Sequence, residues 1–379
     1  MTKTDRFVNS EARTSQELTK KEQPPGTKTT YYNTFNIIMV SKSMLGSLLK
    51  KQLSYEPELK PYFTFRNGKW TSVRPDASIP RSTAAAPAPL KSLRVITWNI
   101  DFMASYPRAR MDTALSHLQS LVSTVPDSCA VVIHLQEMME TEGSDAQAAN
   151  DLSQVKDAHW IQERFNLTDI NPSSWDAPYG QVTLTDRRLA ITSVSRLRFV
   201  SEYQRDALFV DVRLDTSQAK YLRLCNVHLD SSYGSMRPVQ WSALAKHLQN
   251  VDQGISASIL AGDCNANQVR DRTAPQEHGF KDAYLELGGD EGDDSGATWG
   301  FQSVDARRWG RQRLDKEVFW GNVQVDRLER IGVGVEVEDE PVRSSLEDEG
   351  EVTFVTDHYG LIGHFTLTDG LSTTIGEDI

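Results

Sequence analysis

The stretch SILAGDCNAN, residues 258–267, joins a short apolar run to a group of polar side chains. Residues 259–261 predict a buried strand, which ends at a glycine followed by Asp263 and Asn265. Side chains two residues apart on an extended chain lie on the same face, so Asp263 and Asn265 can converge on one target. Gly, Asp and Asn are also ordinary turn residues, and the stretch alone favours a simple turn. The other predicted strand ends must decide between a turn and a site.

Composition places the chain among globular proteins that fold in water. It has 379 residues, 39% hydrophobic and 25% charged, and no stretch approaches the length of a membrane span. Cys129, Cys225 and Cys264 match no zinc spacing and lie in apolar stretches, which favours reduced core residues. Residues 1–30 lack the apolar core of a signal peptide. We therefore expect a monomer of the nucleus or cytoplasm that is not secreted and has no membrane partner.

Four segments differ in their sequence pattern. Residues 1–31 are polar and aperiodic, which predicts a disordered tail. Residues 32–90 are predicted to form an N-terminal extension that ends in a Pro- and Ala-rich linker, and residues 370–379 a C-terminal tail. Residues 91–369 alternate apolar strand candidates with stretches of helical spacing, which predicts one α/β catalytic domain of mixed sheets with helices outside.

The predicted strands of this domain end in polar residues of one chemical kind. Each end has an ordinary explanation, as a turn cap, a helix start, a core histidine or a loop tip, but five such coincidences are harder to accept than one site. So much acid in one place requires a cation, and oxygen ligands without cysteine favour Mg²⁺ or Mn²⁺ over zinc. The residues at these ends are Asn99, Asp101, Glu137, His228, Asp263, Asn265, Asp357 and His358.

Six motifs in this order resemble those of the endonuclease/exonuclease/phosphatase superfamily. They are TWNID (97–101), LQE (135–137), NVHLDS (226–231), GDCN (262–265), RLDK (313–316) and TDH (356–358). The resemblance covers roughly residues 93–368 and is greatest to the 5′-tyrosyl-DNA phosphodiesterases, with RDALFVDV (205–212) and GATWGFQ (296–302) as further shared features. It implies a four-layered α/β sandwich, with two mixed sheets packed face to face, and one Mg²⁺-dependent hydrolytic site.

The resemblance also implies a metal-binding set. Glu137 is similar to the principal metal ligand of the family, and Asn99, Asp101 and Asp357 would complete the shell of metal and water. Mg²⁺ is the implied cofactor, and Mn²⁺ can substitute for it.

The remaining motif residues would carry out the chemistry, together with Asn99. Asp263 resembles the residue that orients or deprotonates the attacking water, and Asn265 the residue that positions the phosphate. His358 would stabilise the charge that develops on the phosphate, and Asp315 would orient its imidazole. His228 would donate a hydrogen bond to the phosphate.

Substrate-binding residues follow from the same resemblance and from one basic run. Trp299 matches a tryptophan that packs on the DNA strand, and Arg237 and Gln240 would support the site. A basic run precedes and follows Asp315, so we expect it to cradle the phosphate backbone. Its members are Arg307, Arg308, Arg311, Arg313 and Lys316.

Four positions depart from the family pattern. Thr356 replaces a serine but keeps the hydroxyl, and Phe102 replaces a small residue. Asn267 stands where the repair enzymes carry an arginine, and Lys316 also replaces an arginine. The last two leave the metal chemistry intact and place the substrate in question.

The function implied is hydrolysis of a 5′-phosphotyrosyl–DNA linkage to a 5′ phosphate in DNA repair, with a tyrosyl adduct on a single-stranded DNA end as partner. The net charge of −11 opposes a nucleic-acid partner as a sum, but the distribution of charge matters more. Alternatives within the superfamily are an abasic endonuclease, an RNA exonuclease, or a phosphoinositide or sphingomyelin phosphatase. A catalytically silent nucleic-acid-binding module is an alternative of another class.

Overall fold

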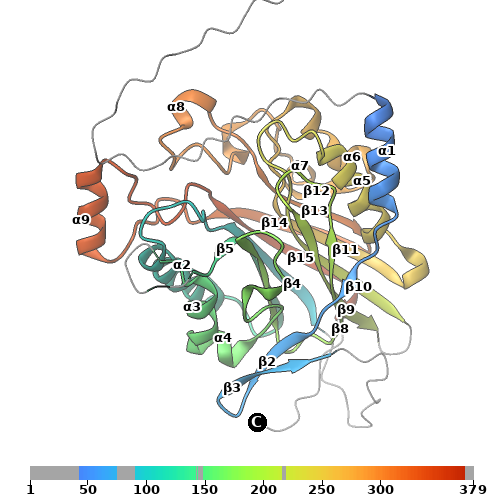
Figure 1. Ribbon diagram of the computed structural model, residues 1–379. Helices are drawn as coiled ribbons and strands as arrows, with labels where there is room; N and C mark the ends of the chain where they lie inside the picture. The colour runs from blue at the N-terminus through green and yellow to red at the C-terminus, as the bar shows by residue number, and fades with distance from the viewer. Residues whose placement is uncertain (1–41, 75–89, 142, 144–147, 216–218, 372–379) are drawn as a thin grey trace, which may run out of the picture. The chain divides into compact units, whose positions relative to one another are not determined.

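Two mixed β-sheets pack face to face in the part of the chain that the structure describes (Figure 1). This computed structural model describes residues 42–74, 90–141, 143, 148–215 and 219–371. Residues 39–379 cluster as one unit. The expected disordered tail at 1–31, the linker at 75–89 and the end of the C-terminal tail lie outside the described residues.

The first sheet has seven strands in the described residues, in the order β1-β8-β9-β10-β11-β13-β12. Only β10 and β11 are parallel among its neighbours, so their carboxyl ends meet at one edge. The strands are β1 (Glu58–Leu59), β8 (Ile191–Arg198), β9 (Asp206–Asp215), β10 (Lys220–His228), β11 (Ile255–Asp263), β12 (Lys281–Asp282) and β13 (Asp315–Gly321).

The second sheet has eight strands in the same part of the chain, in the order β14-β15-β4-β5-β7-β6-β2-β3. Here β4 and β5 are the parallel pair, and the other neighbours are antiparallel. The strands are β2 (Tyr62–Arg66), β3 (Lys69–Val73), β4 (Leu90–Asn99), β5 (Cys129–Met139), β6 (Phe165–Leu167), β7 (Tyr179–Asp186), β14 (Val323–Ile331) and β15 (Gly360–Leu371).

Strand β5 shows why the central strands are continuous apolar runs. Val132 belongs to the core between the two sheets, whereas Val131 and Ile133 belong to the core beneath the helices. Successive side chains of a strand point to opposite faces, so a strand covered on both faces needs apolar residues at every position.

Helices cover the outer face of each sheet, which completes four layers. α2 (Pro107–Ser123), α3 (Asp151–Asp157) and α4 (His159–Arg164) pack on the second sheet, and α5 (Arg237–Leu248) and α6 (Ala274–Glu277) on the first. The predicted four-layered α/β sandwich is confirmed. The other helices are α1 (Lys42–Leu53), α7 (Ala283–Glu286), α8 (Ala306–Trp309) and α9 (Glu340–Glu349), with short 3₁₀ segments at Pro172–Ser174, Val251–Gln253, Val269–Asp271 and Asp294–Gly296. None of the described helices is both long and apolar enough to cross a membrane.

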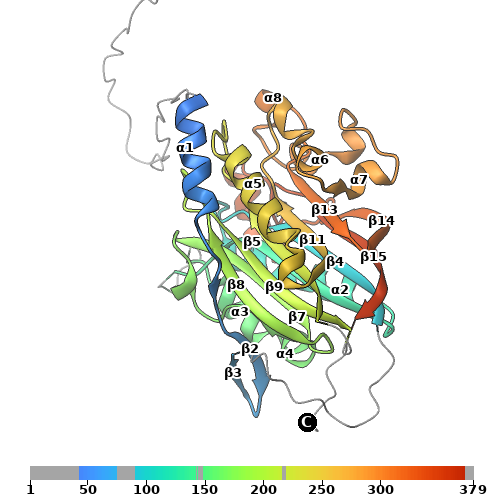
Figure 2. The same cartoon turned by 90° about the vertical axis from the view of Figure 1, so that its right-hand side faces the viewer.

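The N-terminal extension belongs to this fold, so the domain begins before the boundary expected at residue 91. β1 pairs with β8, and the β2–β3 hairpin pairs with β6. Figure 2 shows α1 alongside α5, against which it packs. Asn67 and Gly68 both have positive φ, as a tight hairpin turn requires, and the Trp70 indole donates to Lys156 O at 3.1 Å.

Candidate active site

The strand ends that the sequence singled out meet at one edge of the two sheets. β4 ends at Asn99 and β5 carries Glu137 near its end, while the parallel pair of the other sheet ends at His228 and Asp263. The Asn99 side chain joins the two sheets, because its Nδ2 donates to Glu137 Oε1 and to Asp263 Oδ2, each at 3.1 Å. Four of the five predicted strand ends therefore converge, whereas Asp357 and His358 lie in the loop before β15 and not at a strand end.

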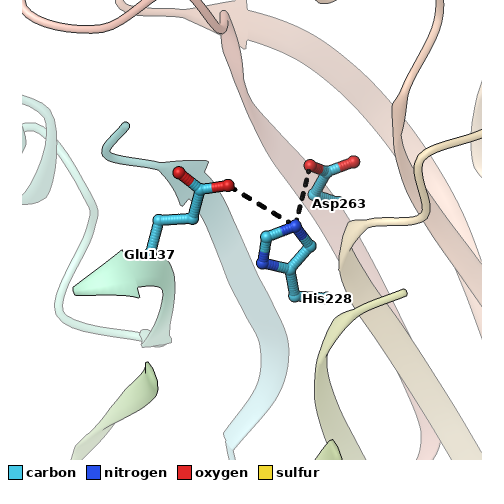
Figure 3. Close-up of side chains that lie close together, drawn as sticks. All are labelled: Glu137, His228 and Asp263. Atoms are coloured by element: carbon cyan, nitrogen blue, oxygen red, sulfur yellow. Dashed lines mark ion pairs between the residues drawn. The ribbon is translucent and has the colours of Figure 1, made fainter. Parts of the chain in front are cut away.

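His228 lies between two carboxylates at the centre of this edge (Figure 3). Its Nε2 is 3.5 Å from Glu137 Oε1 and 3.4 Å from Asp263 Oδ2. Its Nδ1 is 2.8 Å from a guanidinium nitrogen of Arg205. An arginine can only donate, so Nδ1 accepts and Nε2 carries the proton. Burial, together with the charges of Arg205 and His358, lowers the pKa of His228 well below its usual value, so the imidazole is neutral.

A histidine–aspartate pair, His358 with Asp315, lies beside this group. His358 Nδ1 is 2.8 Å from Asp315 Oδ2, and its Nε2 is 3.8 Å from Asp357 Oδ1. Burial lowers the pKa of His358, but the charges of Asp315 and Asp357 outweigh burial and raise it well above its usual value. One site thus holds a neutral imidazole and an imidazolium, and both rings can donate to an anionic substrate.

Three of the site residues have a backbone conformation that few side chains adopt. Asp101 has φ 60°, Glu137 φ 59° and Asn265 φ 47°. Non-glycine residues in this region are uncommon and cluster where function requires an unusual direction of the side chain. Backbone amides of neighbouring segments orient two carboxylates of the site. Phe102 N donates to Glu137 Oε2 at 3.1 Å, and Asn265 N donates to Asp263 Oδ1 at 2.8 Å.

The carboxyl groups of the site, of which Asp263 is buried and Asp101 and Glu137 are half-buried, destabilise one another. Burial and the charges of Asp357 and Glu137 raise the pKa of Asp101 well above its usual value. Burial also raises the pKa of Glu137, and burial with the charge of Asp315 raises that of Asp263 to about 7. Bound positive charge would relieve this repulsion. Glu137, Asp101 and Asp357 offer hard oxygen atoms of the kind that a divalent cation prefers. Among the described residues, the ligand atoms that lie within 4.8 Å of one another belong instead to Glu137, His228 and Asp263 and to Asp263, Asp315 and His358.

Two assigned roles differ in detail from the sequence prediction. The Asn99 amide oxygen accepts from Asp101 N at 3.0 Å, so its nitrogen faces Glu137 and it links carboxylates instead of offering oxygen to a metal. The Asn265 Nδ2 donates to Leu229 O at 3.0 Å and to Asp263 Oδ2 at 3.3 Å. Asn265 thus positions Asp263, and its nitrogen has no hydrogen left for a phosphate.

Comparison with solved structures identifies the fold. A humanized TDP2 of D. rerio matches with TM-score 0.53 and 18% identity, over 73% of this chain and 99% of that one. A truncated Caenorhabditis elegans TDP2 gives TM-score 0.54 and 19% identity over 73% and 99%. The chain has the fold of these TDP2 structures. D. rerio TDP2 complexed with single-strand DNA product matches with TM-score 0.52 and 19% identity over the same shares. No protein-family model and no curated protein matches the sequence.

Trp299 contacts the site within the TDP2-like fold, in addition to any role in stacking. Its indole Nε1 donates to Asp357 Oδ2 at 2.6 Å. The Trp299 backbone forms bridges with Gln312 and with His358. The hydrogen bond fixes the direction of the Asp357 carboxylate, a role that the sequence prediction did not include.

Three predicted substrate-binding cations are instead enclosed by the protein. Arg237 is fully buried and donates to both oxygens of Asp271, at 3.1 and 2.7 Å. Arg313 and Lys316 are also buried, and both pair with Asp282 and Glu291. The predictions of direct substrate contact by Arg313 and Lys316 are wrong, because acidic residues distant in the sequence neutralise them. Arg237, predicted to support the site, is likewise neutralised by Asp271.

The outer part of the basic run remains at the surface. Arg307 and Arg308 are exposed on α8, and Arg308 stacks on Trp309 at 4.6 Å from the ring centroid. Arg311 is exposed beside the Phe301 ring, at 4.4 Å, and also pairs with Asp294. A phosphate-binding role therefore stays a prediction for these three arginines alone.

Three residues that orient site residues through hydrogen bonds were not predicted from the sequence. Arg205, which sets the tautomer of His228, lies in the quoted RDALFVDV motif and received no role. The Thr298 hydroxyl accepts from Asp315 N at 3.0 Å, and the Thr356 hydroxyl donates to Asn99 O at 2.9 Å. All three residues lie in quoted motifs, and only this membership could have drawn attention to them.

Proposed function

We propose that the protein is a metal-dependent phosphodiesterase that hydrolyses a 5′-phosphotyrosyl–DNA linkage to a 5′ phosphate in DNA repair. The observation that carries the proposal is the grouping of Glu137, His228 and Asp263 beside the His358–Asp315 pair. Phosphodiester hydrolysis needs a base for water, donors for the phosphoryl oxygens and a site for a cation. This group of residues supplies all three.

The cation of the proposed site is Mg²⁺, for which Mn²⁺ can substitute. Glu137 would hold it, with Asp101 and Asp357 and intervening water completing the shell. When bound, the ion would polarise a phosphoryl oxygen and neutralise developing charge.

A side chain of the protein takes up the proton of the attacking water. Asp263 accepts a proton from the attacking water; its pKa of about 7, raised by burial and by the charge of Asp315, suits a base at neutral pH. Asn99 and Asn265 hold the Asp263 carboxylate in one direction. An attacking water bound to this carboxylate would have to approach phosphorus from the side opposite the leaving group.

The two histidines stabilise the charge that spreads over the phosphoryl oxygens. His228 donates from Nε2, whose proton is fixed there by Arg205 at Nδ1. His358 donates as an imidazolium, held in place by Asp315. Such preoriented donors at the site of developing charge are a major source of catalysis.

A phenolate leaving group suits these residues. Phenol has a pKa of about 10, so it departs with less protonation than a sugar alkoxide requires. The motif resemblance to 5′-tyrosyl-DNA phosphodiesterases and the shared fold with a TDP2 bound to single-strand DNA product both support the DNA substrate.

A substrate panel tests this proposal. The protein with Mg²⁺ is given a 5′-tyrosyl oligonucleotide, an abasic duplex, poly(A) RNA and an inositol phosphate, with EDTA as the metal control. We expect release of tyrosine and a 5′ phosphate at a kcat/KM at least about 100-fold above that for each other substrate, a difference of about 2.7 kcal/mol. Preference for any other member of the panel would reassign the substrate within the fold.

A further inference from the structure

One buried arginine ties together the two chain segments that carry Asp101 and Asp357. Arg110 lies in the first turn of α2 and is 3% exposed. Its Nε, Nη2 and Nη1 donate to three backbone carbonyl oxygens. These acceptors are Ser105 O at 2.6 Å, Val352 O at 3.0 Å and Phe354 O.

The partners of Arg110 differ from those of other buried arginines in this protein. Arg196, Arg223 and Arg237 each pair with a carboxylate. Among the described residues, Arg110 donates its side-chain hydrogen bonds to backbone carbonyls and forms no ion pair within 4 Å. A guanidinium has five N–H donors in a fixed plane, so it can hold several chain segments in one geometry.

The segments that it joins carry two of the carboxylates proposed to hold the cation. Ser105 follows Asp101 by four residues, and Phe354 precedes Asp357 by three. The Thr356 hydroxyl donates to Asn99 O at 2.9 Å, so the two segments lie side by side at the site. A clamp between their backbones therefore fixes how the Asp101 segment lies against the Asp357 segment.

We propose that Arg110 is a positioning residue that preorganises Asp101 and Asp357 for a divalent cation. The inference rests on the proposed metal site and concerns its affinity, not its substrate. Groups that orient metal ligands from behind typically change metal affinity by about 10- to 100-fold when they are removed.

Metal affinity without substrate measures this role directly. Mn²⁺ is titrated into the full-length protein, and the free ion is followed by electron paramagnetic resonance. We expect Arg110→Met to raise the Kd of Mn²⁺ at least about tenfold. Arg110→Lys keeps a charge but cannot reach three carbonyls, so we expect only partial recovery. Thermal unfolding in EDTA reports whether each variant is folded.

A neighbouring arginine provides the matched control. Arg108 lies on the same helix and also binds backbone carbonyls, donating to Ala148 O at 2.9 Å and Gly143 O at 2.8 Å. Those acceptors belong to another loop. We expect Arg108→Met to leave the Kd of Mn²⁺ unchanged within about twofold, well below the change expected for a metal-positioning residue.

The outcomes separate this inference from the proposed function. Folded Arg110 variants that bind Mn²⁺ as tightly as the wild type would overturn the clamp alone. A wild-type protein that binds no Mn²⁺ would overturn the metal site and the clamp together. Mn²⁺ binding that depends on Arg110, in a protein inactive on 5′-tyrosyl DNA, would support the clamp and reject the substrate. If Arg110→Met does not fold, Arg110→Lys decides: a wild-type Kd overturns the clamp, and a raised Kd supports it.

Discussion

Asp263 is a buried carboxyl group whose pKa is raised to about 7 by burial and by the charge of Asp315. The folded state thus holds this proton more tightly than the unfolded state does, with an unfolded pKa near 3.8. The stability contributed by the protonated group is complete below pH 3.8 and is lost as pH rises through about 7. At neutral pH the ionised base therefore costs stability, which only bound positive charge would offset.

We predict that Asp263→Asn loses activity and gains stability in the metal-free protein. Turnover should fall by about 10²–10⁴-fold on any substrate, because no base remains for the water. In EDTA at pH 8 the free energy of unfolding of the variant should exceed that of the wild type by about 1–2 kcal/mol. This difference should shrink at pH 5. Thermal denaturation at both pH values checks this. A difference that does not change with pH would show that ionisation of Asp263 carries no stability cost.

Trp299 has two separable functions, since its indole N–H binds Asp357 and its ring can stack on a base. We predict that Trp299→Phe lowers kcat about tenfold on both 5′-tyrosyl DNA and a small aryl phosphodiester, because one charge-assisted hydrogen bond is removed. Trp299→Ala should cost a further 1–3 kcal/mol, roughly, on the DNA substrate alone. Steady-state kinetics on both substrates measures the split. Wild-type kcat for Trp299→Phe would show that the bond to Asp357 is dispensable.

At the scale of elements, the segment from α1 to β3 completes both sheets. Gln52 is fully buried and its Nε2 donates to Arg198 O at 3.1 Å, while β1 and β2 cover strand edges. The strands here are short and largely exposed, with a buried residue only in β2, and they lack the long apolar runs of β4 or β5. Their pairing partners lie about a hundred residues away, so local sequence could not place them inside the domain.

We therefore predict that a chain starting at Lys91, the start expected for the catalytic domain, is poorly stable. Unpaired strand edges and the exposed side of α5 should lower Tm by about 10 °C or more and promote aggregation. A chain starting at Lys42 keeps these elements and is the matched control. Differential scanning calorimetry compares them. Equal Tm values for the two chains would show that the stable domain begins at residue 91.

The long strands and the polar residues at their ends could be predicted from the sequence. Burial on two faces imposes apolar runs, and a break in such a run marks a strand end. The direction in which a side chain points could not be predicted. Asn99 turns its nitrogen to Glu137, and Arg313 turns inward to Asp282, because partners distant in sequence decide both. Arg110 carries no local signal, because it binds backbone carbonyls, and Arg205, which binds a histidine ring, is marked only by its place in the RDALFVDV motif.

At the scale of the whole molecule, the net charge of −11 conceals a division between buried and exposed cations. Arg313 and Lys316 are neutralised by acids inside the protein, whereas Arg307, Arg308 and Arg311 are exposed. Only exposed cations release counterions when they bind phosphate. An acidic protein can thus bind DNA through a local surface, provided that this surface lies near the site.

The salt dependence of DNA binding tests whether this exposed surface contacts the DNA. Replacing Arg307 and Arg308 with Gln should weaken binding to a single-stranded oligonucleotide and reduce the slope of log K against log salt by about 0.7 for each phosphate that the protein no longer neutralises. Arg327→Gln, which changes an exposed arginine of β14, is the control and should not change the slope. Hydrolysis of a small aryl phosphodiester should stay at the wild-type rate in all variants, because no backbone phosphate is present. Fluorescence anisotropy between 50 and 200 mM salt, roughly, gives the slopes. An unchanged slope for Arg307→Gln/Arg308→Gln would place the strand on another face of the protein, with the hydrolytic site unaffected.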